Sequence, residues 1–413
     1  MRILFLSPTN AGYCANNVRH NGGGWVGALA AELSRRDDMK LGIAFEGAGA
    51  WNDCRSGISY FPITANASFK SRMVRRWDPH AEERLLLPRV HRAIADFKPD
   101  IVHIFGSENA WGCIAGETDI PCVIHLQGFL PAYDNAKYPP GISRRIGFDE
   151  WLCHPLRSYR KHWFDLVFRR RAAREIGIVK SCNNFFGRTD WDRDIVELYH
   201  PGARYWYCSE MLREEFYRAA GSWRHHERRE MRLVSVLSTP TYKGHDLILK
   251  TADLLKRHTE ISFRWKVFGG FDRKYWERQT GIVASEVNVD SGGVASAETL
   301  REELLDADVF VHPSYIDNSP NGVCEAQMLG MPVVAVNAGG VGSLIRNGES
   351  GCLVPANDPI SMAARIKDAI CDRGLAEKLG KAAAEVAAQR HDRANIILDL
   401  LRCYNGLLGN TAK

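Results

Sequence analysis

The chain has few of the features that mark disulfide-rich, zinc-binding or membrane-spanning proteins. Its 413 residues include 11 cysteines, which are odd in number, scattered and free of any Cys-x-x-Cys pair. This pattern argues against a disulfide framework or a zinc site and favours reduced thiols in a cytoplasmic protein. No apolar run approaches the roughly 20 residues that cross a bilayer. Residues 1–8 favour a first buried strand over a signal peptide, because no small-residue cleavage site follows them.

A strong charge of either sign is also missing, since the net charge is only +5. Residues 1–210 hold 28 Lys and Arg against 23 Asp and Glu, whereas the remainder balances at 26 against 26. Much of the excess lies between residues 144 and 171, interleaved with aromatic residues. Two interpretations stay open: a solvated helix face, or contact with an anionic membrane surface or a lipid-phosphate acceptor. We expect no nucleic-acid partner, because no known binding motif accompanies the basic residues.

Short apolar segments alternate with longer helical patterns, and this alternation predicts an α/β fold built of βαβ units with parallel sheets. In the first half we predict strands at residues 3–6, 41–45, 58–61, 101–105, 123–126 and 184–187, and helices at 25–34, 82–97 and 190–199. In the second half we predict strands at 233–237, 263–268, 283–287, 309–312 and after Pro332, and helices at 244–257, 271–280, 297–306, 359–372, 375–389 and 393–408.

The length predicts two domains. We expect an N-terminal Rossmann-like, acceptor-binding domain at residues 1–215, with a basic and aromatic insertion at about 129–174. A polar, charged segment at 219–232 has no evident core face, as is typical of linkers. A C-terminal Rossmann-like, donor-binding domain would cover 216–390, and 391–413 would form a helix packed on either domain. Two such domains would face a central cleft.

Two carboxylates, Asp317 and Glu325, lie on either side of a predicted helix start near Gly322. This segment follows a predicted strand, and the carboxyl ends of parallel strands bind ligands in open α/β folds. Carboxylates accept hydrogen bonds from hydroxyl groups, and helix N-termini attract phosphate. The segment therefore predicts a site for a polyhydroxylated, phosphorylated ligand such as a nucleotide sugar.

Two glycine-containing segments are further candidates for contact with phosphate. Gly22, Gly23 and Gly24 precede an apolar helix, where consecutive glycines let backbone N–H groups approach a phosphate or a sugar; a flexible turn is the alternative. They lie well after the first strand, which argues against a dinucleotide-binding fingerprint. Lys243 and Gly244 open another helix, where a lysine suits a diphosphate; an exposed structural lysine is the alternative.

Polar residues also follow predicted strands of the first half. His125 ends the strand at 123–126, and His103 lies in the strand at 101–105 with Glu108 close behind. Side chains at these strand ends point toward the ligand site of an α/β sheet, although a buried, hydrogen-bonded histidine is the alternative for each. Arg188 follows the strand at 184–187 and either faces the cleft or forms a structural salt bridge.

Together these segments resemble a retaining glycosyltransferase of the two-Rossmann-domain (GT-B) type, specifically glycosyltransferase family 4. The similarity covers most of the chain and is strongest in residues 243–355. The family pattern has Lys-Gly at a helix start, Pro-Ser, two Glu separated by seven residues, Gly-x-Pro-Val and Gly-Gly. The matching residues here are Lys243-Gly244, Pro313-Ser314, Asp317 with Glu325, Gly330-Met331-Pro332-Val333 and Gly339-Gly340.

The resemblance implies a role for each matching residue. Glu325 would bind the ribose hydroxyls of the nucleotide, Asp317 would contact the donor sugar, and Lys243 would neutralise the leaving diphosphate. His125 would lie near the anomeric carbon. Backbone groups would contact the phosphates, the sugar or the acceptor at Asn318, Ser319, Pro320, Asn321, Gly22, Gly23 and Gly24. No metal or other cofactor is implied, because a lysine and helix dipoles take over charge stabilisation.

The chain departs from the family pattern at three positions. Asp317 replaces the usual first Glu and is shorter by one methylene. The arginine expected five or six residues before Lys243 is absent, which leaves one cation where the family has two, and Arg188 is a candidate substitute. Ser343 stands where many members have Glu after the Gly-Gly turn.

The sequence thus predicts transfer of a hexose-type sugar from a nucleoside diphosphate sugar to a glycan or lipid-linked glycan, with retention of configuration. We expect this activity in surface polysaccharide or glycolipid biosynthesis, in the cytoplasm or peripherally on the inner face of the cell membrane. Three alternatives stay open: a nucleotide-sugar epimerase or hydrolase on the same fold, a non-catalytic glycan- or membrane-binding protein, and a nicotinamide-dependent dehydrogenase.

Overall fold

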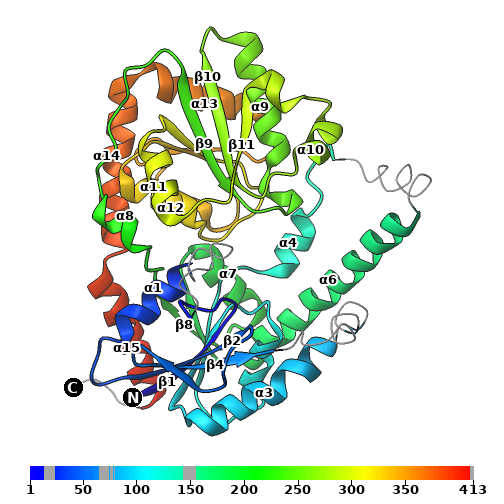
Figure 1. Ribbon diagram of the computed structural model, residues 1–413, viewed down its shortest axis with the longest axis vertical. Coiled ribbons are helices and arrows are strands. Elements are labelled where there is room, and N and C mark those ends of the chain that lie inside the picture. Colours follow the sequence, from blue (N-terminus) through cyan, green and yellow to red (C-terminus); the bar gives the residue numbers. More distant parts are fainter. Residues whose placement is uncertain (14–23, 65–73, 75–77, 79, 143–154, 410–413) are drawn as a thin grey trace. The chain divides into compact units, whose positions relative to one another are not determined.

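The computed structural model describes residues 1–13, 24–64, 74, 78, 80–142 and 155–409 (Figure 1). The chain divides into two compact units, each with its own sheet. Unit 1 contains Met1–Asp134, Arg145–Met211 and Arg393–Lys413, and unit 2 contains Asn135–Arg144 and Leu212–Asp392. No helix in the described part of the chain combines the length and the apolar character needed to span a membrane.

Unit 1 is built on an eight-stranded sheet with the order β3-β4-β2-β1-β5-β6-β7-β8. All neighbours pair in parallel except β3 with β4, which pair antiparallel. The central strand β5 is buried along its whole length, as expected for a strand covered on both faces. The strands are β1 (Arg2–Ser7), β2 (Lys40–Glu46), β3 (Asp53–Arg55), β4 (Ile58–Ile63), β5 (Ile101–Phe105), β6 (Cys122–His125), β7 (Asn184–Gly187) and β8 (Arg204–Tyr207).

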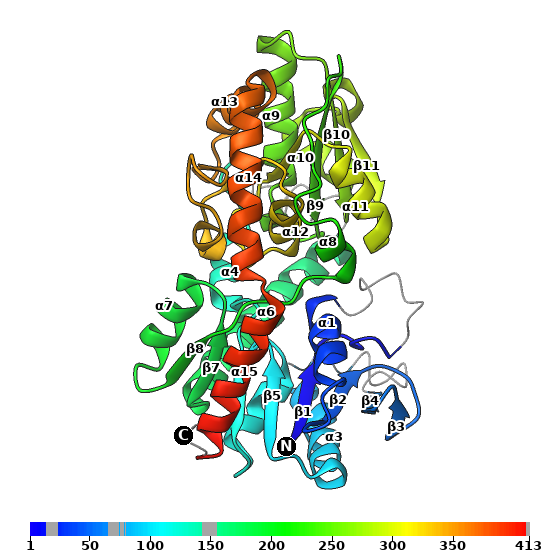
Figure 2. The same ribbon diagram turned by 90° about the vertical axis from the view of Figure 1, so that its left-hand side faces the viewer.

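Helices cover the sheet of unit 1. They are α1 (Gly24–Leu33), α3 (Ala81–Phe97), the 3-10 helix η2 (Ala110–Gly116), α4 (Leu130–Ala136), α6 (Pro155–Ser181), α7 (Asp190–Tyr199) and α15 (Arg393–Leu407). The α7 helix begins where the Thr189 side chain accepts a hydrogen bond from the backbone N–H of Asp192. The C-terminal helix α15 runs alongside β7 and β8 (Figure 2), and Tyr404 on it hydrogen-bonds His103 Nδ1 at 2.6 Å.

Unit 2 is built on a six-stranded, fully parallel sheet with the order β11-β10-β9-β12-β13-β14. The strands are β9 (Met231–Leu237), β10 (Phe263–Gly269), β11 (Val289–Gly293), β12 (Val309–His312), β13 (Val333–Val336) and β14 (Cys352–Val354). The helical elements are α8 (Glu214–Arg218), η3 (Thr241–Lys243), α9 (His245–His258), α10 (Arg273–Thr280), η4 (Ala284–Val287), α11 (Ala297–Leu305), α12 (Asn321–Leu329), η5 (Gly339–Ser343), α13 (Pro359–Cys371) and α14 (Arg373–Arg390).

The predicted alternation of strands and helices in an α/β fold is confirmed, with one error in the second half. Residues 283–287 were predicted to form a strand, whereas Ala284–Val287 form a 3-10 turn and the strand begins at Val289. The apolar residues Ala284 and Val287 both reach the core, which a single helical turn achieves as well as a strand does. Asn288 then takes a left-handed conformation with φ 58°, and β11 begins at the next residue, Val289.

The prediction that residues 219–232 lack a core face is also wrong. Trp223 is 5% exposed and belongs to the apolar cluster around α12 and β13. Its indole Nε1 donates a hydrogen bond of 2.7 Å to the carbonyl oxygen of Ala307. A single tryptophan therefore anchors a segment whose remaining residues are largely polar, and one anchor leaves no periodic pattern in the sequence.

Candidate active site

The candidate site in unit 2 is built on the loop between β12 and α12, and two glycines bring other segments against this loop. Gly339 has φ 59°, and a Cβ there would overlap the carbonyl oxygen of Asp317. Gly340 N donates to that same oxygen at 2.9 Å. Gly244 has φ 78°, and a Cβ there would overlap the carbonyl oxygen of Pro313. Glycine in the Lys-Gly pair and the first glycine of the Gly-Gly pair are therefore required by close backbone contact with one loop.

Asp317 is held by two neighbours in unit 2. Its Oδ2 atom lies 2.6 Å from Lys243 Nζ and 3.2 Å from His312 Nε2. Burial opposes ionisation of this carboxyl group, but the charge of Lys243 and the hydrogen bonds from His312 and Lys243 outweigh it and lower the pKa of Asp317. The side chain therefore stays a carboxylate and an acceptor for hydroxyl groups.

Lys243 is the last residue of η3, immediately before the left-handed Gly244 that starts α9. Its side chain is 16% exposed and bonded to Asp317, so its position is fixed while part of it stays accessible. An ammonium group next to a loop carboxylate can exchange that partner for a phosphate oxygen, because both are anionic acceptors.

Glu325 lies in the second turn of α12 and is paired with Arg213, which precedes α8. Arg213 Nε and Nη2 each donate a 2.8 Å hydrogen bond to one of the two carboxylate oxygens. Both side chains are buried, at 10% and 3% exposure. Burial raises the pKa of Glu325, and the Arg213 charge and hydrogen bonds counteract this rise. The paired guanidinium thus favours the ionised acceptor form that a ribose contact requires.

The four residues Asn318, Ser319, Pro320 and Asn321 lead into α12. Pro320 is the N-cap residue, and its own side chain makes no capping hydrogen bond. The first N–H groups of a helix have no intrahelical acceptor and carry a partial positive charge. The N-terminus of α12 therefore offers an anion-binding end one turn from Glu325 and directly after Asp317.

The predicted site residues of the first half lie in unit 1. His125 is fully buried at the end of β6, with ring contacts to Trp25, His103, Phe105 and Phe186. Neither of its ring nitrogens has a hydrogen-bond partner among the described residues. Burial lowers the pKa of His125 far below its usual value, so its imidazole is neutral.

Arg188 and Gly24 also lie in unit 1. Arg188 is 3% exposed, with Nη1 3.4 Å from Glu210 Oε2 and the guanidinium 5.2 Å from the Trp25 ring centre. It is therefore a charge-paired arginine within its own unit. Gly24 begins α1 with φ 57°, a conformation that favours glycine. Gly22 and Gly23 lie outside the described residues.

The sequence pointed to Glu108 only by its place after a strand, and it indicated neither Glu175 nor Arg213. In unit 1, burial raises the pKa of Glu108 to about 7 and that of Glu175 to about 8. Glu175 accepts hydrogen bonds from Ser107 Oγ at 2.5 Å and Leu130 N at 2.7 Å. In unit 2, Arg213 lies 112 positions from Glu325, and so no local pattern could reveal their pairing.

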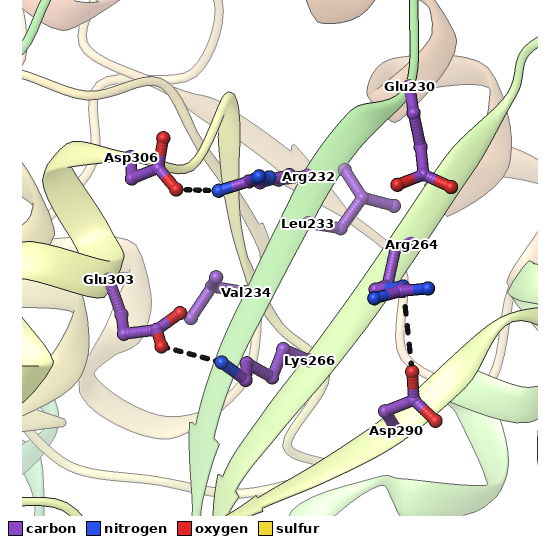
Figure 3. Close-up of a pocket in the computed structure, with 9 residues that line it drawn as sticks. All are labelled: Glu230, Arg232, Leu233, Val234, Arg264, Lys266, Asp290, Glu303 and Asp306. Carbon is purple, nitrogen blue, oxygen red and sulfur yellow. Dashed lines mark hydrogen bonds and ion pairs between the residues drawn. The ribbon is translucent and has the colours of Figure 1, made fainter.

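A separate pocket of unit 2, with a volume of about 250 Å³, lies around the first residues of β9 and β10 (Figure 3). Its basic side chains are paired with acids: Arg232 with Asp306, Arg264 with Asp290 at 3.7 Å and Lys266 with Glu303 at 2.5 Å. Ligands of open α/β sheets bind at the carboxyl ends of the strands, so this pocket at the opposite edge is not the candidate active site.

Comparison with known proteins establishes the fold and shows a family similarity in the second half of the chain. Over the whole chain, the structure matches the sucrose-phosphate synthase of Thermosynechococcus elongatus with a TM-score of 0.70 at 14% identity, covering 100% of both chains. It also matches Anabaena HepE in complex with UDP-glucose with a TM-score of 0.65 at 14% identity, covering 99% of this chain and 100% of that one. These matches establish the GT-B glycosyltransferase fold.

Residues 224–386 match the family model described as "Glycosyl transferases group 1". The sulfoquinovosyl transferase SQD2 of Arabidopsis thaliana is 26% identical over 318 residues, which are 73% of this chain and 55% of that protein. A D-inositol 3-phosphate glycosyltransferase of Paenarthrobacter aurescens is 30% identical over 149 residues, 34% of this chain and 36% of that protein. The chain thus spans about half or less of the curated relatives it matches. The similarity to the glycosyl transferases group 1 family (GT4) thus covers residues 224–386 and lies within unit 2.

Proposed function

We propose that the protein transfers a hexose-type sugar from a nucleoside diphosphate sugar to a glycan or lipid-linked glycan, with retention of anomeric configuration. One observation carries this proposal: Lys243, Asp317, Glu325 and the N-terminus of α12 surround one loop of unit 2. This set provides a cation and a helix end for the diphosphate and two carboxylates for sugar and ribose hydroxyls.

The chemistry follows from where charge develops. As the bond between the anomeric carbon and the phosphate oxygen breaks, its electron pair moves to the diphosphate while the sugar ring becomes positive. Lys243 and the α12 N-terminus would stabilise the developing negative charge. An acceptor hydroxyl oxygen would form the new bond on the same face and pass its proton to the leaving phosphate. When the diphosphate takes the ammonium of Lys243, Asp317 would be released to accept hydrogen bonds from the donor sugar.

Unit 1 would hold the acceptor. His125, Gln127 and Glu108 all have buried polar atoms with no hydrogen-bond partner in the described part of the chain. His125 ends β6, and Gln127 and Glu108 follow the carboxyl ends of β6 and β5. Groups of this kind suit the neutral hydroxyls of a glycan, because they can both donate and accept. His125 would approach the anomeric carbon as a neutral imidazole, and Gly23 and Gly24 would border the donor phosphate or the acceptor.

The test is product analysis of the purified protein with nucleoside diphosphate sugars. UDP-glucose is the first donor to supply, because the similar HepE was solved with it. Nucleoside diphosphate should be released faster when a glycan or lipid-linked acceptor is added, and the product should keep the donor's anomeric configuration. Release that is equally fast without acceptor would favour a hydrolase or epimerase, and no release with UDP-, GDP- or ADP-sugars would favour a non-catalytic binding protein.

A peripheral location on an anionic membrane surface is part of the proposal, in keeping with a lipid-linked acceptor. On α6, Phe164 is 59% exposed and Arg169 and Arg170 are exposed, a combination of aromatic and basic side chains typical of interfacial binding. In a sedimentation assay the protein should bind vesicles that contain anionic lipid more tightly than neutral vesicles, and the difference should shrink with added salt. Equal partitioning to both would contradict the electrostatic part of this proposal.

A further inference from the structure

Arg213 uses only part of its hydrogen-bonding capacity within the chain. Its Nε and Nη2 atoms both bind the Glu325 carboxylate, each at 2.8 Å, in the paired geometry typical of arginine. The remaining nitrogen, Nη1, is buried and has no hydrogen-bond acceptor among the described residues. Because an unpaired buried donor is costly, this nitrogen is positioned to bind an acceptor from outside the described part of the chain.

The guanidinium is also fixed in orientation. Its central carbon lies 4.9 Å from the ring centre of Phe216 on α8, and the residue as a whole is 9% exposed. The two bonds to Glu325 define the guanidinium plane, so Nη1 projects from the edge that faces away from the carboxylate. A rigid donor of this kind binds a ligand oxygen with little loss of side-chain entropy.

The charge balance of the candidate site in unit 2 favours a further hydrogen-bond donor to the diphosphate. Lys243 is balanced by Asp317 and Arg213 is balanced by Glu325, so these four side chains together carry no net charge. A nucleoside diphosphate brings at least two negative charges to them. The chain also lacks the arginine that the family pattern places before Lys243, and Arg188 is paired with Glu210 in unit 1.

We infer that Arg213 is the second donor-binding cation: its Nε and Nη2 hold the Glu325 carboxylate for the ribose, and its Nη1 donates to a ribose or phosphate oxygen of the nucleotide. This inference rests on the proposed function. It adds to the donor site a residue outside the segment that carries the family pattern, and it explains how the site works without the arginine before Lys243.

The test measures UDP affinity by calorimetric titration in Arg213→Met, Glu325→Gln, the double variant and Arg213→Lys. Arg218→Met on α8 is the matched control, because Arg218 is an exposed arginine that pairs with Glu214 on its own helix. Arg213→Met should weaken UDP binding at least tenfold, and Arg213→Lys should recover only part of the loss, since lysine cannot form the paired contact. Arg218→Met should bind UDP as the wild type does.

The double variant separates a nucleotide contact from a structural role. It removes both charges of the buried pair and so avoids leaving an uncompensated carboxylate, which would destabilise Arg213→Met. If Nη1 contacts the nucleotide, the double variant should bind UDP several-fold more weakly than Glu325→Gln alone. Equal affinity of these two variants would overturn the inference while leaving the proposed function intact. If the wild type binds none of UDP, GDP and ADP, the proposed function and the inference both fail.

Discussion

The two sheets end in different kinds of polar groups. At the carboxyl edge of the unit 2 sheet, the polar side chains are ion pairs, Lys243 with Asp317 and Arg213 with Glu325. At the corresponding edge of the unit 1 sheet, His125 is a neutral imidazole and burial shifts the pKa of Glu175 to about 8, so that its neutral form is favoured at pH 7. The unit 2 edge therefore carries fixed charges, whereas the unit 1 edge combines one buried ion pair, Arg188 with Glu210, with polar groups kept largely uncharged.

This difference fits the roles that we propose, donor binding in unit 2 and acceptor binding in unit 1. A diphosphate leaving group develops negative charge, and fixed charges that need little reorganisation stabilise it well. A glycan acceptor brings neutral hydroxyls, and neutral donors and acceptors match them without a costly buried charge. The contrast predicts that substitutions in unit 2 change the transfer rate and the stability through the loss of a charge. Changes of pH should alter mainly the stability of unit 1.

The largest effect is expected for Lys243→Ala. Loss of one preorganised group that stabilises developing charge lowers the rate of transfer by about 10²–10³-fold. The rate of nucleoside diphosphate release at saturating acceptor measures this. Lys266→Ala is the control, because Lys266 is an ion-paired lysine of the same unit that lines the separate pocket. If Lys243→Ala and Lys266→Ala have the same rate, Lys243 has no catalytic role.

A smaller effect is expected for Asp317→Asn, which removes the charge but keeps the size of the side chain. The lysine partner is 16% exposed, so the hydrogen bonds to this carboxylate contribute about 1.5–3 kcal/mol to the free energy of unfolding. Thermal unfolding should therefore begin at a lower temperature. Asp317→Glu keeps the charge, so its melting temperature should fall less. An unchanged melting temperature for Asp317→Asn would show that the pair with Lys243 does not stabilise unit 2.

The smallest effect, counted per pH unit, is expected for the pH dependence of the stability of unit 1. The pKa of Glu175 is raised from its usual 4.5 to about 8, so the folded state holds a proton that the unfolded state loses. Stability from this group is therefore fully present below about pH 4.5 and is lost as the pH rises through 8, by at most about 1.4 kcal/mol per pH unit. Glu175→Gln imitates the protonated form, and its melting temperature should fall less between pH 6 and 9 than that of the wild type. Identical pH profiles would contradict the buried neutral carboxyl.

Much of unit 2 could be predicted from the sequence, because its site depends on residues that are close together in the chain. Asp317, Glu325 and the start of α12 lie within one strand-loop-helix segment, and Gly244 and Gly339 are explained by their contact with that segment. The pairing of Lys243 with Asp317 was not predicted, since it depends on a loop conformation. Neither was Arg213, which reaches Glu325 only through the fold.

Less of unit 1 could be predicted. His125 was placed correctly at a strand end, but nothing in its neighbouring residues indicates a ring buried between Trp25, His103 and Phe186. The carboxyls Glu108 and Glu175 are far apart in sequence, and their raised pKa values arise from burial that only the packed structure creates. The roles of Lys243, Asp317, Glu325 and residues 318–321 in unit 2 stay predictions, as do those of His125, Arg188, Gly23 and Gly24.

The central claim is that the charged edge of unit 2 binds a nucleoside diphosphate sugar through Lys243, Asp317 and Glu325. The most direct measurement is the thermal shift of the wild type and of Glu325→Ala with UDP-, GDP- and ADP-glucose. Binding to the folded state raises the melting temperature by mass action. We predict that one nucleotide series stabilises the wild type and that Glu325→Ala loses this response. No shift with any of the three, or an equal shift in Glu325→Ala, would contradict the account.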